Sequence, residues 1–177
     1  MRRQPSRLTF AQTLRNCSEM VQQAPLLALD NQICFALYAL NRAVTARYRP
    51  LLAELDLTYP QYLVMLVLWE HGADGEAARV SDVGARLRLD SGTLTPLLKR
   101  LQERSLLRRQ RQSDDERVVR LVLTEAGWQL RAKALQVPEQ LLCDLDVEPH
   151  RLVALRQELR NLLATLENPA PSDESSP

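Results

Sequence analysis

The 177-residue sequence predicts a mainly α-helical protein with one small β-hairpin. Residues 81–87 and 91–101 form two short helical segments separated by a turn of about three residues, a spacing typical of a helix-turn-helix. Two extended segments, residues 107–111 and 117–123, follow and predict the hairpin. Apolar helical patterns towards both ends of the chain predict helices that pair with a second copy.

The first short helix is predicted from its capping residues. Ser81 is expected at the N-cap, and Asp82 lies in the first turn, where a carboxylate interacts favourably with the positive end of the helix dipole. The second helix is predicted from a stripe of leucines at helical spacing, formed by Leu94, Leu97, Leu98 and Leu101. This stripe predicts a helix with one buried face and one exposed face.

Pro96 is unfavourable for the second helix. If Ser91 is its N-cap, Pro96 lies inside the helix and removes one intrahelical hydrogen bond. The sequence therefore predicts that this helix starts late or bends at Pro96.

The segment between the two extended stretches, residues 112–116, contains the Ser and Asp residues that favour a turn. Between Lys99 and Arg120 there are eight Lys and Arg residues against four Asp and Glu, although the net charge of the whole chain is only +1. Positive charge is therefore concentrated where the phosphates of DNA would lie. A helix-turn-helix followed by a basic hairpin predicts a winged helix-turn-helix domain that binds DNA.

The composition limits the class of protein. A hydrophobic content of 45% is enough for the core of one domain of ordinary size, and no apolar run reaches the length of a membrane span. The three cysteines, Cys17, Cys34 and Cys143, are an odd number without close spacing, and we identify no secretory signal. We therefore expect a cytoplasmic protein with free thiols, no disulfide framework, no metal and no cofactor.

Five regions are expected along the chain. They are an N-terminal extension at 1–28, a dimerisation and sensor helix at 29–57, the DNA-binding domain at 58–127, C-terminal dimerisation helices at 128–167, and a disordered tail at 168–177. Met20 is an alternative start of the natural protein, which would then lack Cys17. Asp30 is expected to cap a long helix that begins near Asn31.

Capping residues also predict a helix that precedes the helix-turn-helix. Thr58 and Pro60 predict the start of a core helix, which Gly72 and Gly75 are expected to end. This helix would contain the core residues Tyr62 and Trp69.

After the hairpin, Thr124 is expected to cap a helix that runs to about Gln136 and is interrupted by Pro138. From Pro149 onwards, leucines recur close to heptad spacing, at Leu152, Leu155, Leu159, Leu162 and Leu166. Such a stripe is typical of a seam between helices. We therefore predict a homodimer with two wings.

Five segments together resemble the MarR family of winged-helix regulators. Residues 114–117 (DDER) and 123–127 (LTEAG) resemble the wing signature of this family. Longer matches resemble its organic hydroperoxide resistance repressors, and these are residues 29–38 (LDNQICFALY), 57–65 (LTYPQYLVM) and 90–97 (DSGTLTPL). The resemblance covers about residues 29–166 and implies dimerisation through the terminal helices.

Cys34 is the candidate redox sensor. It lies near the start of its predicted helix, where the helix dipole favours a thiolate, and Tyr38 follows one turn later on the same face. The resemblance implies that Tyr48 and Tyr59 support the thiolate and that Cys143 is the resolving cysteine. On one continuous helix Tyr48 would lie about 21 Å from Cys34, so this pairing requires Tyr48 of a second subunit.

The expected chemistry is oxidation of Cys34 by an organic hydroperoxide to a sulfenic acid, which Cys143 converts to a disulfide. A disulfide needs Cα atoms within about 7 Å. If reduced Cys34 and Cys143 start further apart, closing the disulfide must move helices at the dimer interface and release DNA. We therefore predict a repressor that releases its palindromic operator on oxidation and derepresses genes for peroxide detoxification.

The expected DNA contacts lie on the second short helix and on the hairpin. We expect contacts with the major groove from Ser91, Thr93, Thr95, Lys99 and Arg100. Arg117 is expected in a narrow A/T-rich minor groove, and Asp115 is expected to hold that arginine.

Two other classes of function remain open from the sequence. The first is a MarR-type repressor that binds a small phenolic ligand, in which Cys34 is a buried structural residue. The second is a thiol peroxidase, which is disfavoured because there is no Cys-x-x-Cys motif and only His71 and His150 are available as imidazole bases. We expect the protein not to be an enzyme.

Overall fold

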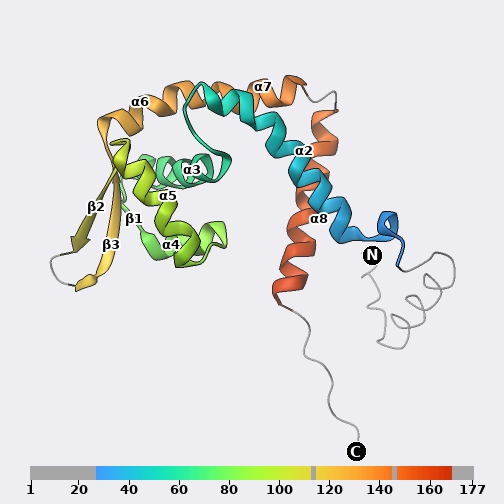
Figure 1. Ribbon diagram of the computed structural model, residues 1–177, viewed down its shortest axis with the longest axis horizontal. Helices are drawn as coiled ribbons and strands as arrows, with labels where there is room; N and C mark the ends of the chain where they lie inside the picture. The colour runs from blue at the N-terminus through green and yellow to red at the C-terminus, as the bar shows by residue number, and fades with distance from the viewer. Residues whose placement is uncertain (1–26, 113–114, 145–146, 169–177) are drawn as a thin grey trace, which may run out of the picture. The chain divides into compact units, whose positions relative to one another are not determined.

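The computed structural model describes residues 27–112, 115–144 and 147–168 (Figure 1). The fold is mainly helical with a small antiparallel sheet, as predicted. In chain order the elements are the short 3-10 helix η1 (Leu29–Asn31), α2 (Ile33–Ala53), α3 (Tyr59–Ala73), β1 (Ala78–Arg79), α4 (Val80–Leu87), α5 (Ser91–Glu103), β2 (Leu107–Gln112), β3 (Asp115–Leu123), α6 (Glu125–Ala134), α7 (Gln136–Asp144) and α8 (Pro149–Glu167).

The chain divides into two compact units, Met1–Pro50 and Leu51–Pro177. Helix α2 crosses this boundary three residues before its own end, and Pro50 lies inside the helix. None of the described helices is long and apolar enough to cross a membrane.

Helix α3 forms the centre of the second unit. It packs against α4, α5, β1 and β3, and it is buried on nearly every face. Its largest buried side chains are Tyr62 and Trp69, whose rings meet edge to face with their centroids 6.5 Å apart. Both residues are therefore core residues, as predicted.

The start of α3 follows its capping signals. The backbone N–H of Thr58 and the Thr58 hydroxyl both donate to Oε1 of Gln61, at 2.8 and 3.0 Å. Gln61 is buried, so this capping box satisfies a polar side chain inside the protein. The helix continues through Gly72 to Ala73, and the chain turns at Gly75, where φ is +77°.

The N-cap of helix α4 lies two residues earlier than predicted. The expected N-cap, Ser81, lies inside the helix, and its hydroxyl donates to Asp82 at 3.1 Å. Arg79 occupies the N-cap position in an extended conformation because it belongs to β1, which pairs with β3. The preceding strand therefore decides where this helix begins.

Helix α5 buries the predicted leucine face, with Leu94, Leu98 and Leu101 buried and Leu97 half-buried. Its N-cap is Asp90, not Ser91, and Asp90 accepts hydrogen bonds from the backbone N–H of Thr93 at 2.8 Å and the Thr93 hydroxyl at 2.9 Å. These bonds lower the pKa of Asp90. The expected late start was wrong, because the helix begins at Ser91 and includes Pro96.

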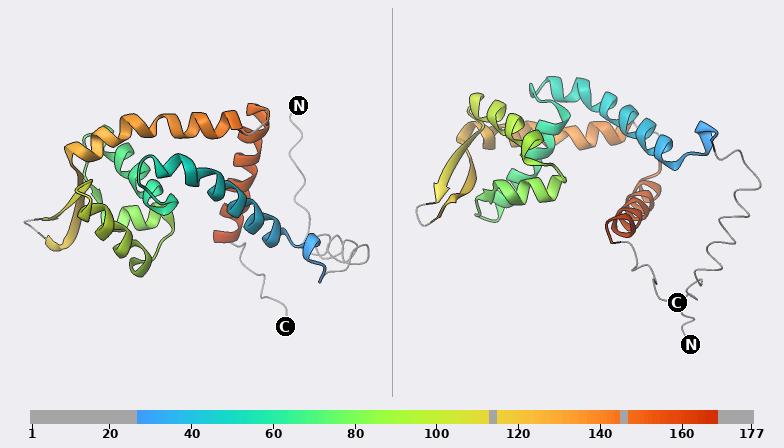
Figure 2. Two further views of the ribbon diagram at one scale, coloured as in Figure 1. Left: turned by 45° about the horizontal axis from the view of Figure 1, so that its top comes forward. Right: turned by 60° about the horizontal axis from the view of Figure 1, so that its bottom comes forward.

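The sheet has the strand order β1-β3-β2, and all neighbouring strands are antiparallel. Leu107 pairs with Leu123 at one end of the hairpin, and Gln112 pairs with Asp115 at the other, beyond a register shift between Arg111 and Gln112. The strands are longer than predicted, and the two-residue strand β1 was not predicted. In the views of Figure 2 the β2–β3 hairpin projects beyond helices α3 to α5, as a wing does.

Two boundaries in the terminal helices differ from the sequence prediction. Asp30 does not cap α2, because it lies within η1, and α2 begins at Ile33. Pro138 does not interrupt a helix but lies in the first turn of α7, where a missing N–H costs little. The preceding helix, α6, ends at Ala134, and Leu135 keeps helical dihedral angles between the two.

Gly127 joins α3, the wing and α6. Its N–H donates to the Thr124 hydroxyl at 3.1 Å, and its carbonyl accepts a hydrogen bond from Trp69 Nε1 at 2.9 Å. A Cβ atom on Gly127 would lie 2.2 Å from the backbone carbonyl oxygen of Leu106. Only glycine therefore allows α6 to pack this closely on the start of the wing.

We predict that Gly127→Ala destabilises the protein by about 1–3 kcal/mol, the usual cost of overpacking a well-packed core. Urea unfolding at neutral pH measures this free energy. The matched control is Gln129→Ala, an exposed position on the same helix, which should change it little. An alanine variant as stable as the wild type would show that the junction has room to adjust.

The Asp90 cap predicts a pH-dependent contribution to stability. Because the pKa of Asp90 is lowered in the folded protein, the carboxylate stabilises the fold above the pKa of the unfolded chain, about 3.9, and this contribution is lost as the pH falls through the lower folded value. Asn caps helices equally well but does not titrate. The stability difference between wild type and Asp90→Asn should therefore shrink as the pH falls from 7 to about 2; a constant difference would contradict this assignment.

Candidate functional site

The exposed face of α5 carries the side chains expected to meet DNA. Ser91, Thr93, Thr95, Lys99 and Arg100 are all exposed, opposite the buried leucines. The Thr93 hydroxyl is engaged by the Asp90 cap, and Lys99 lies 3.9 Å from Glu103 in an exposed ion pair. Such a pair is weak in water, so Lys99 remains available to a phosphate.

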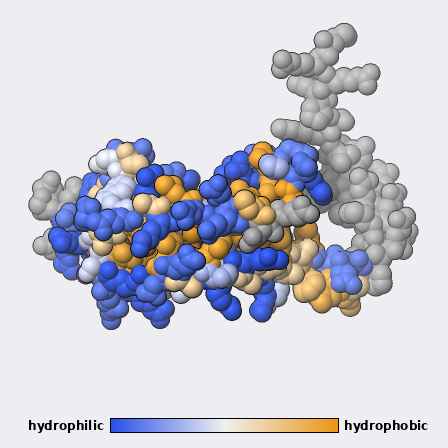
Figure 3. Space-filling model, turned by 90° about the horizontal axis from the view of Figure 1, so that it is seen from above, coloured by the Kyte–Doolittle hydropathy of each residue, from blue (hydrophilic) through white to orange (hydrophobic). Residues whose placement is uncertain are grey.

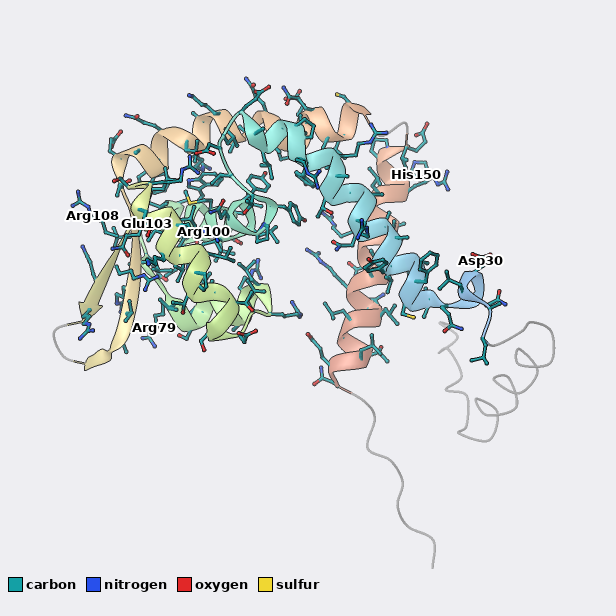
Figure 4. The ribbon with its side chains drawn as sticks, in the orientation of Figure 1. Asp30, Arg79, Arg100, Glu103, Arg108 and His150 are labelled. Atoms are coloured by element: carbon teal, nitrogen blue, oxygen red, sulfur yellow. The ribbon has the colours of Figure 1, made fainter. Side chains whose placement is uncertain are left out.

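The wing adds positive charge beside this helix. Arg108, Arg109 and Arg111 on β2 are exposed, as is Arg79 on β1. Arg109 also donates to the backbone carbonyl of Thr95 at 3.3 Å, which ties strand β2 to α5. Figure 4 shows Arg79 and Arg108 on the sheet and Arg100 on α5.

The predicted minor-groove residues, Asp115 and Arg117, both lie on β3. The structure describes only their backbone, so their pairing stays a prediction. Arg79 was not among the expected DNA-contacting residues, because the short strand that carries it gave no sequence signal.

Cys34 is exposed and is the second residue of α2, close to the position expected from the sequence. Tyr38 follows one helical turn later and is 57% exposed. Its hydroxyl accepts a hydrogen bond from Arg42 at 3.1 Å, and the Arg42 guanidinium lies over the ring, 5.6 Å from its centroid. The Tyr38 proton therefore remains free to be donated elsewhere.

Helix α2 is continuous from Ile33 to Ala53 and includes Tyr48. At 1.5 Å per residue, the fourteen positions between Cys34 and Tyr48 place them about 21 Å apart along the axis. Tyr48 therefore cannot contact the thiol of its own chain.

Tyr59 is the first residue of α3 and is half-buried. Burial raises the pKa of its hydroxyl above the usual value near 10, so the group stays protonated and can donate a hydrogen bond. Cys143, in α7, is exposed with a free thiol. Cys17 and Met20 lie outside the described residues.

The two histidines, His71 and His150, lie on different helices, α3 and α8. His150 is exposed beside Glu148, whereas His71 is half-buried. Within the described residues, no group of three or more His, Cys, Asp and Glu side chains could hold a metal ion.

Sequence reasoning missed two ion pairs that connect distant segments. Arg88, in the turn between α4 and α5, binds the carboxylate of Glu167 at the end of α8, with Nη2 to Oε2 at 3.1 Å. This bond and the charge of Arg88 lower the pKa of Glu167. Arg104, after α5, binds Asp56, with Nε to Oδ2 at 3.3 Å.

Comparison with known proteins agrees with this geometry. Residues 46–133 match the family model described as transcriptional regulator SarA/Rot. The chain is 46% identical over 140 residues to the organic hydroperoxide resistance transcriptional regulator of Bacillus subtilis (strain 168), an alignment that covers 79% of this chain and 92% of that protein. It is 44% identical over 150 residues to the HTH-type transcriptional regulator TtmR of Methylorubrum extorquens (strain PA1), covering 81% and 75%.

Among solved structures, reduced AbfR bound to DNA superposes with a TM-score of 0.67 at 30% identity, covering 86% of this chain and 99% of AbfR. These relatives are transcriptional regulators, and the solved neighbours include regulators bound to DNA. The chain therefore belongs to the MarR-type family of winged-helix, DNA-binding transcriptional regulators, and its similarity to the organic hydroperoxide resistance regulators spans most of its length.

Proposed function

We propose that this protein is a homodimeric repressor that senses organic hydroperoxides through Cys34 and releases its operator when that cysteine is oxidised. The observation that carries the proposal is the exposed thiol of Cys34 in the first turn of α2, one turn before Tyr38. The similarity to the Bacillus subtilis regulator supports the effector class, since that protein is named for organic hydroperoxide resistance. A structure named for disulfide-formed AbfR, 31% identical with a TM-score of 0.56, supports cysteine chemistry in a relative.

The proposed reaction begins with the Cys34 thiolate. It attacks the terminal oxygen of the hydroperoxide, the O–O bond breaks, and the leaving alkoxide takes a proton to become an alcohol. Cys34 is oxidised to a sulfenic acid, and the peroxide is reduced. The Cys143 thiol then attacks the sulfenic sulfur, which forms a disulfide and releases water.

Tyrosine hydroxyls would stabilise the thiolate by donating hydrogen bonds. Tyr38 follows Cys34 one helical turn later, and Arg42 donates to its hydroxyl and lies over its ring, which leaves the phenolic proton free. Tyr59 stays protonated because burial raises its pKa. Since the length of α2 separates Tyr48 from Cys34 of the same chain, a role for Tyr48 requires the second subunit.

The exposed apolar surface supports dimerisation. Helix α8 exposes Val153, Leu155, Leu162, Leu163 and Leu166, and α7 exposes Leu142 beside Cys143. Figure 3 shows hydrophobic residues exposed among hydrophilic ones. We propose that a second copy covers the α8 face, because the leucines follow the near-heptad spacing of a helix seam.

Operator binding would use the exposed face of α5 and the basic wing. A dimer presents two copies of α5, which must match half-sites about one DNA turn apart. A change at Cys34 that shifts the dimer helices would alter this spacing, and the protein would release a palindromic operator. Arg117 and Asp115 are proposed to act in the minor groove.

The central prediction concerns DNA binding before and after oxidation. One equivalent of cumene hydroperoxide should weaken binding of the reduced protein to the DNA upstream of its own gene by at least about tenfold, and dithiothreitol should restore it. Fluorescence anisotropy at fixed salt concentration measures both affinities. Cys34→Ser should bind DNA and ignore the oxidant.

Two outcomes would contradict the proposal. A wild-type protein that ignores the hydroperoxide would make Cys34 a structural residue and favour a small-ligand regulator. A Cys34→Ser variant whose DNA binding is still weakened by the hydroperoxide would show that the oxidant acts on another residue.

The shared-site prediction can be tested with mixed dimers. Cys34→Ser and Tyr48→Phe chains, differently tagged and co-purified, should form heterodimers in which one sensor is intact, because Cys34 of one chain meets Tyr48 of the other. These heterodimers should oxidise at one of their two sites at the wild-type rate, whereas Tyr48→Phe homodimers should oxidise slowly. Heterodimers as slow as the Tyr48→Phe homodimer would show that Tyr48 does not act across the interface.

A further inference from the structure

Arg104 links the end of the DNA-reading helix to the end of α2. It is the residue that follows α5, and its side chain is only 29% exposed. The guanidinium makes an ion pair to the Asp56 carboxylate, with Nε 3.3 Å from Oδ2. It also donates to the backbone carbonyl of Leu55 at 3.1 Å and to that of Asp56.

The segment that Arg104 holds is the turn that ends α2. There the N–H groups of Leu55 and Leu57 both bond to the carbonyl of Leu52, and Asp56 has a φ of +51°. Leu52, Leu55 and Leu57 are all buried. The turn is therefore fixed in the core, and its outward carbonyls are satisfied by a cation at the negative end of the α2 dipole.

This turn lies just after the boundary between the two compact units. The boundary between the compact units falls at Pro50–Leu51, so the turn belongs to the same unit as α5, while most of α2 belongs to the other. Helix α2 also carries Cys34 at its opposite end. Helix α2 thus enters the second unit at Leu51 and ends in the turn to which Arg104 is bonded.

We infer that Arg104 is a positioning residue that couples α2 to the DNA-reading helix α5, so that the state of Cys34 alters the placement of α5. This inference rests on the proposed function. Charge-assisted bonds to two carbonyls and one carboxylate hold the guanidinium in a fixed orientation, whereas a lysine could satisfy fewer of these acceptors at once. Arg104 itself need not touch DNA or the thiol.

The test measures the ratio of DNA affinities before and after oxidation by cumene hydroperoxide, in full-length dimeric protein. Arg104→Met should reduce this ratio by about tenfold, while the rate of Cys34 oxidation, followed by thiol labelling, stays at the wild-type value. Arg104→Lys and Asp56→Asn should give intermediate ratios. If Arg104→Met does not fold, the same comparison is made with these two milder variants. The matched control is Arg86→Ala, which removes an exposed arginine paired with Glu70 and should leave the ratio unchanged.

The outcomes separate this inference from the proposed function. If the wild-type affinity ignores the hydroperoxide, both proposals are contradicted. If the wild type responds and all three variants respond equally, only the role of Arg104 is contradicted. A variant that weakens DNA binding equally in both oxidation states would show a purely structural contact and would also overturn the inference.

Discussion

The burial of α3 on nearly all its faces is the constraint on which the DNA-binding unit depends. Because α4, α5, β1 and β3 all pack on this one helix, each must turn its apolar side inward and its polar side outward. For α5 this buries Leu94, Leu98 and Leu101 and leaves the hydroxyl and basic side chains exposed. The exposed face that we propose to contact DNA is thus a consequence of core packing. Trp69 extends the same core to α6 through its hydrogen bond to Gly127.

The proposed sensor lies outside this core. Cys34 and Cys143 are both exposed, on helices that carry apolar side chains at the surface. A thiol at the end of a long helix can react with peroxide without disturbing the packing around α3. The effect on DNA must then pass through the helices, and α2 offers a direct connection because it enters the second unit and ends in the turn held by Arg104. The proposed switch therefore needs the rigidity of α2 as well as the reactivity of Cys34.

Much of the fold could be predicted from local patterns. The leucine spacing of α5, the capping residues Thr58 and Thr124, and the β-branched stretch of β3 are short-range signals, and the structure confirms the elements they predict. The errors lie where two neighbouring residues could each cap a helix, or where strand pairing sets the residue at which a helix begins. Asp90 and Ser91 are both good caps, and only the hydrogen bonds to Thr93 distinguish them. Helix α4 begins at Val80 because strand pairing fixes Arg79.

Long-range side-chain contacts had no sequence signal. Arg104 and the carbonyl it binds at Asp56 are 48 residues apart, and Arg88 and Glu167 are 79 residues apart. No periodic pattern connects such positions, and charged residues at the surface are ordinary. Cys34 and Tyr38 were singled out by their place at the start of a predicted helix. Tyr48, Tyr59 and Cys143 were named only through the family resemblance, because a cysteine in a helix is most often a small buried hydrophobic residue.

Oxidation of Cys34 is proposed to change the spacing of the two copies of α5 in a dimer. The most direct measurement is the distance between two spin labels, introduced through an encoded non-cysteine amino acid at Gln102, which is exposed on α5. Pulsed electron paramagnetic resonance of the reduced protein should give one narrow distance compatible with half-sites about 34 Å apart, and the hydroperoxide should shift it. An unchanged distance after complete oxidation of Cys34, or no measurable pair distance at all, would contradict the account.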